Sequence, residues 1–381
     1  MIPRTLFSDE HELFRDMARR FIAAEITPFH AEWEKIGVVP RELWRKAGEA
    51  GLLCPNVPVE YGGPGANFLY NVVITEELGR AGATGPQFTV HSDMVASYIM
   101  SFGTPEQKAR WLPKMVSGEL IGALGLTEPG CGSDLKALRT QAARDGEHYV
   151  INGQKTYISN GQLCDLIVLA CKTDPQAGAK GVSLIVVETD REGFKRGRRL
   201  EKLGLKAQDT SELFFQDVRV PVANRLGEPG AGFKMAMHKL AHERLIIAVN
   251  ATATCEAVLE WTVQYTRERR AFGRPIAEFQ NTRFKVAELT ALTQGMRVFV
   301  DRCIELAVDD RLDSTDAAMA KMVASELQCR VVDECLQFFG GYGYTLDYPI
   351  AHAYIDARVR RIAGGSSEVM REIVSRKVFG A

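Results

Sequence analysis

The sequence predicts an α+β fold that is mainly α, with a small β domain between two helical domains. Helical periodicity broken by Pro and Gly runs to residue 121, and short β-branched runs of strand length follow over 122–232. Long helical stretches then return. A chain of 381 residues suffices for about two to three domains. We therefore expect domains at 1–121, 122–232 and 233–381.

The N-terminal part contains two clear helix signals. Apolar residues recur at three- and four-residue spacing over residues 14–22, which gives one helix an apolar face, and Ser8 with Asp9 is suited to cap that helix. Thr104-Pro105 is typical of an N-cap followed by Pro at the first helical position. Between these signals, the Gly- and Pro-rich residues 61–65 indicate an irregular loop.

The middle part contains strand-length runs at 166–171, 182–187 and 213–220. Residues 148–151 and 155–158 flank the dipeptide Asn152-Gly153, which predicts a β-hairpin with a tight turn at this dipeptide. The C-terminal part has no Gly or Pro from Phe233 to Phe272, and further helical runs cover 280–310 and 316–339. Such lengths suit an antiparallel helical bundle.

Composition and charge exclude several classes of protein. The formal net charge is −1 with no run of like charges, so we expect no nucleic-acid partner. The N-terminus lacks the apolar core of a secretory signal, and we expect no membrane span. The eight cysteines include no CxxC pair, which favours buried thiols in a reducing compartment. We therefore expect a cytoplasmic protein.

Residues 124–134, Leu-Gly-Leu-Thr-Glu-Pro-Gly-Cys-Gly-Ser-Asp, form the most informative segment. Glycines let a backbone approach a ligand closely, and free N–H groups bind carbonyl or phosphate oxygens. The segment resembles the TEPxxGSD signature of the acyl-CoA dehydrogenase family. Three further elements resemble family motifs in the same order: Tyr157-Ile158-Ser159-Asn160-Gly161, Arg269 to Arg274 followed by Phe279-Gln280, and Gln337 to Gly343.

The resemblance implies an N-terminal helical domain, a middle β-barrel and a C-terminal four-helix bundle, with FAD as the cofactor. It implies FAD-binding roles for Leu124, Leu126, Thr127, Gly132, Ser133, Tyr157, Ile158, Ser159, Arg269, Phe272, Gln280, Gln337, Phe338, Gly340, Gly341, Ser366 and Glu368, and acyl-CoA-binding roles for Ser133, Arg244 and Gly365. Tyr157 departs from the commonest Trp, although an aromatic ring still stacks. In the family the adenine half of FAD crosses a subunit interface, so we expect a homotetramer, a dimer of dimers, in which Arg269, Gln280 and residues 337–341 serve a neighbouring subunit.

The implied reaction is α,β-dehydrogenation of a fatty acyl-CoA in β-oxidation, with electron-transferring flavoprotein as the electron acceptor. A carboxylate must remove the α proton, and most members supply it as the Glu of a Tyr-Glu-Gly-Thr segment. This chain has Ala363-Gly364-Gly365-Ser366 at that position, so the usual base is absent. In the long-chain and isovaleryl branches the base lies in a Glu-Arg-Leu stretch of the first long C-terminal helix. His242-Glu243-Arg244-Leu245 matches it, so Glu243 is the candidate base.

The backbone N–H of Gly364 is the candidate donor to the thioester carbonyl, because the resemblance implies that role for the position whatever its side chain. Three alternatives remain open at this point. An oxidase that returns electrons to oxygen would share these motifs, and a non-catalytic FAD-binding assembly partner would also lack the usual Glu. The third alternative is a metal site at His238 and His242, but HxxxH without a third ligand is weak, and we expect no metal.

Overall fold

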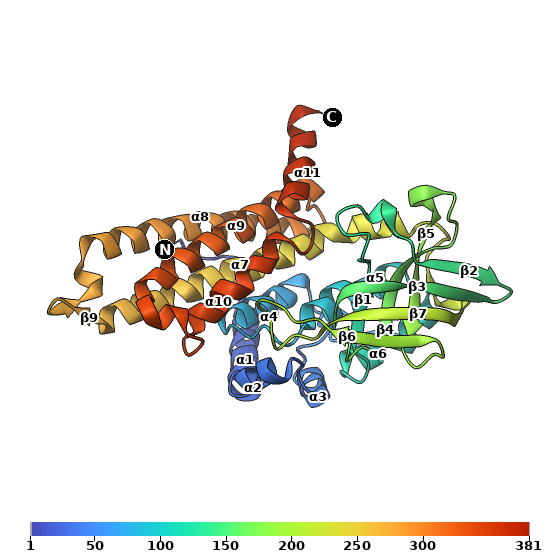
Figure 1. Cartoon of the computed structure of the whole chain (residues 1–381), viewed down its shortest axis with the longest axis horizontal. Helices are drawn as coiled ribbons and strands as arrows, with labels where there is room; N and C mark the ends of the chain where they lie inside the picture. The colour runs from blue at the N-terminus through green and yellow to red at the C-terminus, as the bar shows by residue number, and fades with distance from the viewer. Residues whose placement is uncertain (1, 381) are drawn as a thin grey trace.

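The computed structural model describes residues 2–380, which form two helical domains and one β domain. In Figure 1 the β domain lies at the right-hand end, the long helices of the C-terminal domain extend to the left, and the N-terminal helices lie below them. Strand β1 begins at Gly122 and helix α7 begins at Gly232. The predicted order of helices, strands and helices is therefore confirmed.

The N-terminal domain is helical throughout. Its helices are α1 (Asp9–Glu25), α2 (His30–Ile36), α3 (Arg41–Glu49), α4 (Phe68–Arg80), α5 (Ser97–Phe102) and α6 (Pro105–Val116), and a π-helical segment (Val90–Ala96) leads directly into α5. Both predicted helix starts are confirmed, because α1 follows Ser8 and α6 follows Thr104. The Thr104 amide donates to Gln107 Oε1 (2.9 Å) and the Gln107 amide donates to Thr104 Oγ1 (3.3 Å), a reciprocal capping box.

The middle domain is one eight-stranded sheet. Its strands are β1 (Gly122–Gly125), β2 (Gln141–Asp145), β3 (His148–Ser159), β4 (Leu166–Lys172), β5 (Val182–Glu188), β6 (Phe194–Arg199), β7 (Thr210–Pro221) and β8 (Arg225–Leu226). The order is β6-β7-β3-β2-β4-β5-β8, with β1 parallel to β4. Within residues 2–380 no ladder joins β6 to β8, so the expected β domain is present as a sheet that hydrogen bonds do not close into a ring.

The predicted hairpin turn at Asn152-Gly153 is wrong. Strand β3 continues through this dipeptide, and the turn lies at Gly146, between Asp145 of β2 and His148 of β3. The dipeptide instead forms a register shift against β7, in which Asn152 exchanges hydrogen bonds with Asp217. A Cβ at Gly153 would lie 2.5 Å from Thr140 Oγ1, so close packing explains the glycine.

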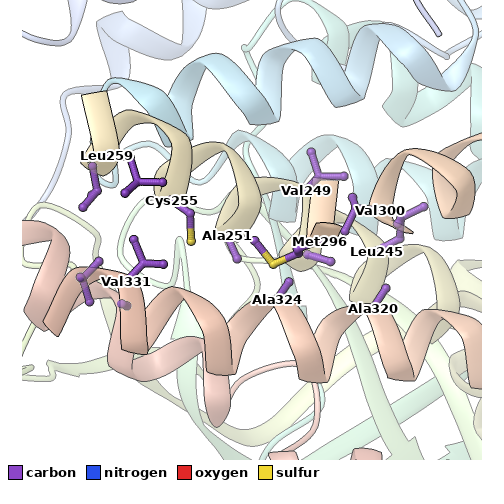
Figure 2. Close-up of a cluster of buried hydrophobic side chains, with 14 of the residues drawn as sticks. Leu245, Val249, Ala251, Cys255, Leu259, Met296, Val300, Ala320, Ala324 and Val331 are labelled. Atoms are coloured by element: carbon purple, nitrogen blue, oxygen red, sulfur yellow. The ribbon is translucent and has the colours of Figure 1, made fainter. Parts of the chain in front are cut away.

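The C-terminal domain contains helices α7 (Gly232–Glu268), α8 (Gln280–Val308), α9 (Ser314–Phe339), α10 (Pro349–Ala357) and α11 (Ser367–Phe379), with a two-strand hairpin of β9 (Arg270–Ala271) and β10 (Arg274–Pro275) after α7. Helix α7 ends four residues before the predicted Phe272, because Arg269 takes an extended conformation and starts the hairpin. Figure 2 shows side chains of the α7, α8 and α9 core, where fully buried Ala251, Ala320 and Ala324 leave room for larger neighbours such as Met296.

Helix α7 is the one helix in residues 2–380 that is long and apolar enough, by length and composition alone, to cross a membrane. Its most apolar 18-residue window is 67% buried inside the protein. The apolar composition of α7 is therefore that of a core helix, packed against α4, α8 and α9.

A buried ion-pair network joins the N-terminal segment to the bundle. The Glu76 carboxylate of α4 accepts hydrogen bonds from Arg4 (2.8 Å), Arg15 (2.8 Å) and Arg297 of α8 (2.8 Å), and Arg4 also binds Asp301 (2.7 Å). Burial alone would raise the pKa of Glu76, but Arg297 and Arg4 outweigh it and hold this pKa at about 2. The network therefore locks the N-terminal domain against α8 while Glu76 stays ionised.

Candidate active site

Glu243 lies on α7 where this helix passes α5. Its side chain is buried, with 5% of its surface exposed, and the hydroxyl of fully buried Tyr98 donates to Glu243 Oε1 at 3.1 Å. Burial raises the pKa of Tyr98 well above its ordinary value, so this hydroxyl stays protonated and remains a donor. The contact joins the N-terminal and C-terminal domains at the carboxylate that the sequence predicts as the base.

The pKa of Glu243 is suited to proton removal near neutral pH. Burial raises it from 4.5 to about 7, although the Tyr98 hydroxyl and the charges of Arg244 and Lys239 act in the opposite direction. A base is most effective when its pKa lies near the working pH, because it is then both ionised and basic. Glu243 therefore has the ionisation behaviour that α-proton removal requires.

The turn at Gly364-Gly365 faces the same stretch of α7 as Glu243. It lies between a 3-10 segment (Arg358–Arg361) and α11, and both glycines have positive φ, +67° and +97°. A Cβ at Gly364 would lie 2.4 Å from Cδ1 of Ile247, which is one helical turn beyond Glu243. In residues 2–380 the Gly364 amide donates to no acceptor, so its N–H is free for a ligand.

Two buried cations lie behind this turn. Lys321 of α9 is fully buried and its Nζ donates to the carbonyl oxygen of Gly365. Arg244, also buried, donates from Nη1 to Ser314 Oγ at 3.4 Å, whereas its Nε has no partner in the described residues. Ser366 accepts a hydrogen bond from the Val369 amide (3.4 Å) and so caps α11 directly after the turn.

The predicted flavin-binding residues of the middle domain lie together. Fully buried Lys155 of β3 bonds to Glu128 Oε1 (2.8 Å) and to the Leu126 carbonyl (3.2 Å), and the Thr156 amide donates to the Thr127 carbonyl (3.0 Å). These bonds hold the segment after β1 beside β3. Farther along the segment, Gly132 and Ser133 are exposed, whereas Leu124 and Leu126 are half-buried.

Tyr157 has the position and strain of a functional residue. It sits at a β-bulge between Lys155 and Ile158, has a φ of +59°, and leaves 68% of its surface exposed. Bulges re-aim side chains next to functional sites, and strained backbone clusters at such sites. Nearby Ser159 accepts a hydrogen bond from Gln208 Nε2 (2.6 Å). Exposed aromatic, hydroxyl and glycine groups side by side fit a flat, polar-edged ring such as a flavin.

The side chain of Ile158 does not take part in this surface. It is 2% exposed and belongs to the core of the β domain, packed with residues such as Ile151 and Leu213. The alternation of a strand explains this, because Tyr157 and Ile158 point to opposite faces of β3. The predicted cofactor contact of Ile158 therefore falls to its backbone groups.

The predicted residues of the C-terminal domain form a second group. Arg269, Gln337, Phe338, Gly340 and Gly341 line one open pocket of about 500 Å³ at the end of α7, where the Arg269 guanidinium lies 5.7 Å from the Tyr342 ring centre. Gln280 and Phe272 lie outside its lining: exposed Gln280 begins α8, and 95% exposed Phe272 packs edge-on against Phe279. Glu368 is exposed in the first turn of α11, four residues after Gly364, and does not line this pocket.

The two groups lie at opposite ends of the chain's long axis, with β9 at the left-hand end of Figure 1 and the β domain at the right-hand end. Arg269 follows Glu243 by 26 residues along α7, about 39 Å at 1.5 Å per residue. The Arg269 pocket and the Tyr157 surface therefore lie at opposite ends of the chain.

Sequence reasoning missed two residues, Tyr98 and Lys321. Tyr98 contacts Glu243 across 145 residues of sequence, and no motif marks it. Lys321 had a usable signal, because it is a single cation within the apolar run Ala317-Ala318-Met319-Ala320-Lys321-Met322-Val323-Ala324. A lysine on an apolar helical face indicates a buried partner.

The fold and this site fit the class of flavin-dependent dehydrogenases, and Glu243 is a buried carboxylate of raised pKa within the site. Comparison with known proteins agrees with this class. Three family models match in sequence order: "Acyl-CoA dehydrogenase, N-terminal domain" at 8–119, "Acyl-CoA dehydrogenase, middle domain" at 123–218 and "Acyl-CoA dehydrogenase, C-terminal domain" at 230–379. The chain belongs to the acyl-CoA dehydrogenase family, so it dehydrogenates an acyl-CoA and uses FAD as its cofactor.

Individual relatives place the chain within the family. It is 47% identical to the mitochondrial long-chain specific acyl-CoA dehydrogenase of Rattus norvegicus over 98% of this chain and 88% of that protein. It is 35% identical to the mitochondrial isovaleryl-CoA dehydrogenase of Oryza sativa over 98% and 92%. The crystal structure of an acyl-CoA dehydrogenase from Geobacillus kaustophilus is 48% identical, covers 98% of both chains and superposes with a TM-score of 0.96. The chain is thus a flavoprotein of fatty-acid oxidation.

Proposed function

We propose that this dehydrogenase converts a long-chain or branched-chain acyl-CoA to its trans-2-enoyl-CoA, with Glu243 as the base that removes the α proton. The observation that carries the proposal is that the Gly364 turn packs against α7 on the stretch of this helix that contains Glu243. The position at which most relatives carry their base is a glycine, and a Cβ there would meet Ile247, which lies one helical turn along α7 from the buried Glu243 carboxylate of raised pKa. The long-chain specific and isovaleryl-CoA relatives support the substrate class.

Each group of the site has a defined task. The ionised Glu243 carboxylate accepts the α proton, and the Gly364 N–H donates to the thioester carbonyl, whose negative charge grows as that proton leaves. Burial of Glu243 and Tyr98 keeps water from the base. FAD, when bound, supplies the acceptor at flavin N5 for the hydride from the β carbon. Exposed Ser133, half-buried Gly365 and buried Arg244, whose Nε has no partner in the described residues, are proposed acyl-CoA contacts.

We further propose that FAD is shared between subunits of a homotetramer built as a dimer of dimers. The flavin would lie against Leu124, Leu126, Thr127, Ser133, Tyr157 and Ser159, while the Arg269 pocket would hold the adenine half of a neighbouring subunit's FAD. The separation of about 39 Å along α7 supports this arrangement. Exposed apolar side chains at the Arg269 end, including Phe272 (95%), Tyr344 (92%) and Phe284 (63%), fit a subunit contact.

Electron-transferring flavoprotein is the proposed electron acceptor, and an oxidase that uses oxygen is the second candidate. The cytoplasm is the proposed location. All eight cysteines are free and are buried or half-buried, and burial raises the pKa of thiols such as Cys54 and Cys171 to about 12. Such thiols are unreactive and suit a reducing compartment.

The test is anaerobic bleaching of the flavin in the purified yellow protein. Acyl-CoAs from butyryl to palmitoyl, with isovaleryl-CoA as the branched example, are mixed with the enzyme in a stopped-flow instrument. We expect rapid bleaching by palmitoyl-CoA or isovaleryl-CoA and slower bleaching by butyryl-CoA. Reoxidation is then followed with electron-transferring flavoprotein or with oxygen. Fastest bleaching by butyryl-CoA would contradict the substrate class, and faster reoxidation by oxygen would establish the oxidase.

A further inference from the structure

Among residues 2–380, Lys321 is the one fully buried side chain that hydrogen-bonds to the diglycine turn at the proposed active site. It projects from an Ala-rich stretch of α9, has no exposed surface, and donates from Nζ to the carbonyl oxygen of Gly365. Lysine is almost never fully buried without a partner, because removing an ammonium group from water carries a large desolvation penalty. The position of Lys321 therefore indicates a function for its hydrogen bond.

The turn has few other bonds that fix its conformation. Gly364 and Gly365 both have positive φ, a region that glycine enters freely but does not prefer. In residues 2–380 neither glycine amide donates a hydrogen bond, whereas the flanking residues are held by the bond from the Ala363 amide to the Val359 carbonyl (2.9 Å) and by the Ser366 cap. The Lys321 bond thus fixes the Gly365–Ser366 peptide, and through it the turn whose Gly364 N–H lies two peptides earlier.

The surroundings make Lys321 sensitive to pH. Burial and the charges of Arg244 of α7 and Arg361 of the preceding 3-10 segment lower its pKa to about 8, although Glu326 of α9 and Glu368 of α11 act in the opposite direction. The folded-state pKa lies below the ordinary value of 10.5, so the ammonium is present below about pH 8 and is lost above it. A positive charge behind the turn also favours negative charge on an oxygen bound in front of it.

We propose that Lys321 is a positioning residue for the dehydrogenation, because its ammonium group orients the Gly364 N–H toward the thioester carbonyl. This inference rests on the proposed function of Gly364. Removing an oxyanion donor from an enzyme slows the reaction by roughly 10²–10³-fold. Loosening such a donor without removing it should therefore slow flavin reduction by roughly 10- to 100-fold.

The main variant is Lys321→Met, which keeps the length of the buried stem and removes the ammonium. Two quantities are measured on FAD-loaded protein: the anaerobic rate of flavin reduction by palmitoyl-CoA from pH 6 to 10, and hydrogen–deuterium exchange of the segment 362–370 without substrate. In the variant we expect roughly 10- to 100-fold slower reduction below pH 8, no alkaline decline near pH 8, and exchange of the glycine amides that is more than about 10-fold faster. Lys46→Met, at an exposed lysine paired with Glu25 (2.8 Å), is the control and should match the parent.

The parent enzyme provides a second test if Lys321→Met does not fold. Its rate should decline above about pH 8, and exchange of segment 362–370, corrected for intrinsic base catalysis, should rise over the same range. A reduction rate within twofold of the parent overturns the proposal, even if the variant melts at a lower temperature. Slower reduction with unchanged exchange also overturns it. If no acyl-CoA bleaches the parent, the proposed function fails, whereas the exchange measurement still reports whether Lys321 orders the turn.

Discussion

Glu243→Gln should slow the reaction and stabilise the fold at the same time. Burial raises the pKa of Glu243 from 4.5 to about 7, and one pKa unit corresponds to about 1.4 kcal/mol. Since the folded-state pKa is the higher one, stability from this group is fully present below pH 4.5 and is lost as pH rises through 7. Glutamine does not ionise. The difference in free energy of unfolding between the variant and the parent should therefore shift by about 2–3 kcal/mol in favour of the variant from pH 5 to pH 8.

The same substitution removes the proposed base but keeps its size and its hydrogen bond from Tyr98. Flavin reduction should slow by about 10²–10⁴-fold, whereas the affinity for acyl-CoA should change little. Urea unfolding of the FAD-loaded protein at pH 5 and pH 8, at fixed protein concentration, measures stability, and anaerobic stopped-flow absorbance measures the rate. Both measurements use one preparation, so misfolding cannot imitate the expected pair of changes.

Glu76→Gln is the matched control, for which we expect a change in stability of the opposite sign. The pKa of Glu76 is held at about 2 by Arg297 and Arg4 despite burial, so removing its charge takes from these cations a carboxylate that they share. This variant should lose about 3–5 kcal/mol at neutral pH. Flavin reduction in Glu243→Gln at the parent rate would refute Glu243 as the base. A stability difference that does not change with pH would refute the raised pKa.

Four further results are expected. Tyr98→Phe removes a hydrogen bond to the ionised form of Glu243, so the acidic limb of the pH–rate profile should move up by about 1–2 units; an unmoved limb would show that the bond does not tune the base. Gly364→Ala should cost about 1–3 kcal/mol in thermal or urea unfolding because of its φ of +67° and the contact with Ile247. Adding Ile247→Val should recover part of that cost, which equal stability of the single and double variants would contradict. In the double variant Glu243→Gln/Gly364→Glu, part of the rate of flavin reduction should return, because both positions face the same space; no recovery would end that argument. Arg269→Ala should lower FAD affinity by about 1–3 kcal/mol, as measured by flavin release on dilution, and an unchanged affinity would contradict the shared cofactor.

The sequence predicted those parts of the fold that depend on local signals. The caps at Ser8 and Thr104 and the starts of α8 and α9 follow from short-range chemistry, so these boundaries agree with the structure to within about two residues. The predicted hairpin turn at Asn152-Gly153 was wrong because this dipeptide suits both a tight turn and a β-bulge. The choice between them depended on Thr140 and Asp217, which are distant in sequence.

The site residues also divide into those that sequence motifs mark and those that depend on contacts between distant parts of the chain. Glu243 and Gly364 were found because the family motifs mark both positions, and the structure adds that they converge. Tyr98 contacts Glu243 across 145 residues and Lys321 contacts Gly365 across 44. The apolar run around Lys321 indicates a buried partner, but no pattern in one sequence identifies either partner. The motif also marks Ile158, and the structure adds that the alternation of β3 turns its side chain into the core.

The ion-pair network around Glu76 has a consequence for how the protein is made. Arg15 is only 61 residues from Glu76, so the two meet early in synthesis, but Arg297 is 221 residues farther along the chain. At about 5–20 residues per second, a ribosome delivers Arg297 roughly 10–45 s after Glu76. During that interval the α4 carboxylate faces an unfinished interface, with the surface that will pack on α7 still uncovered. The N-terminal helices are therefore a natural substrate for chaperones until the bundle emerges and the last arginine completes the network.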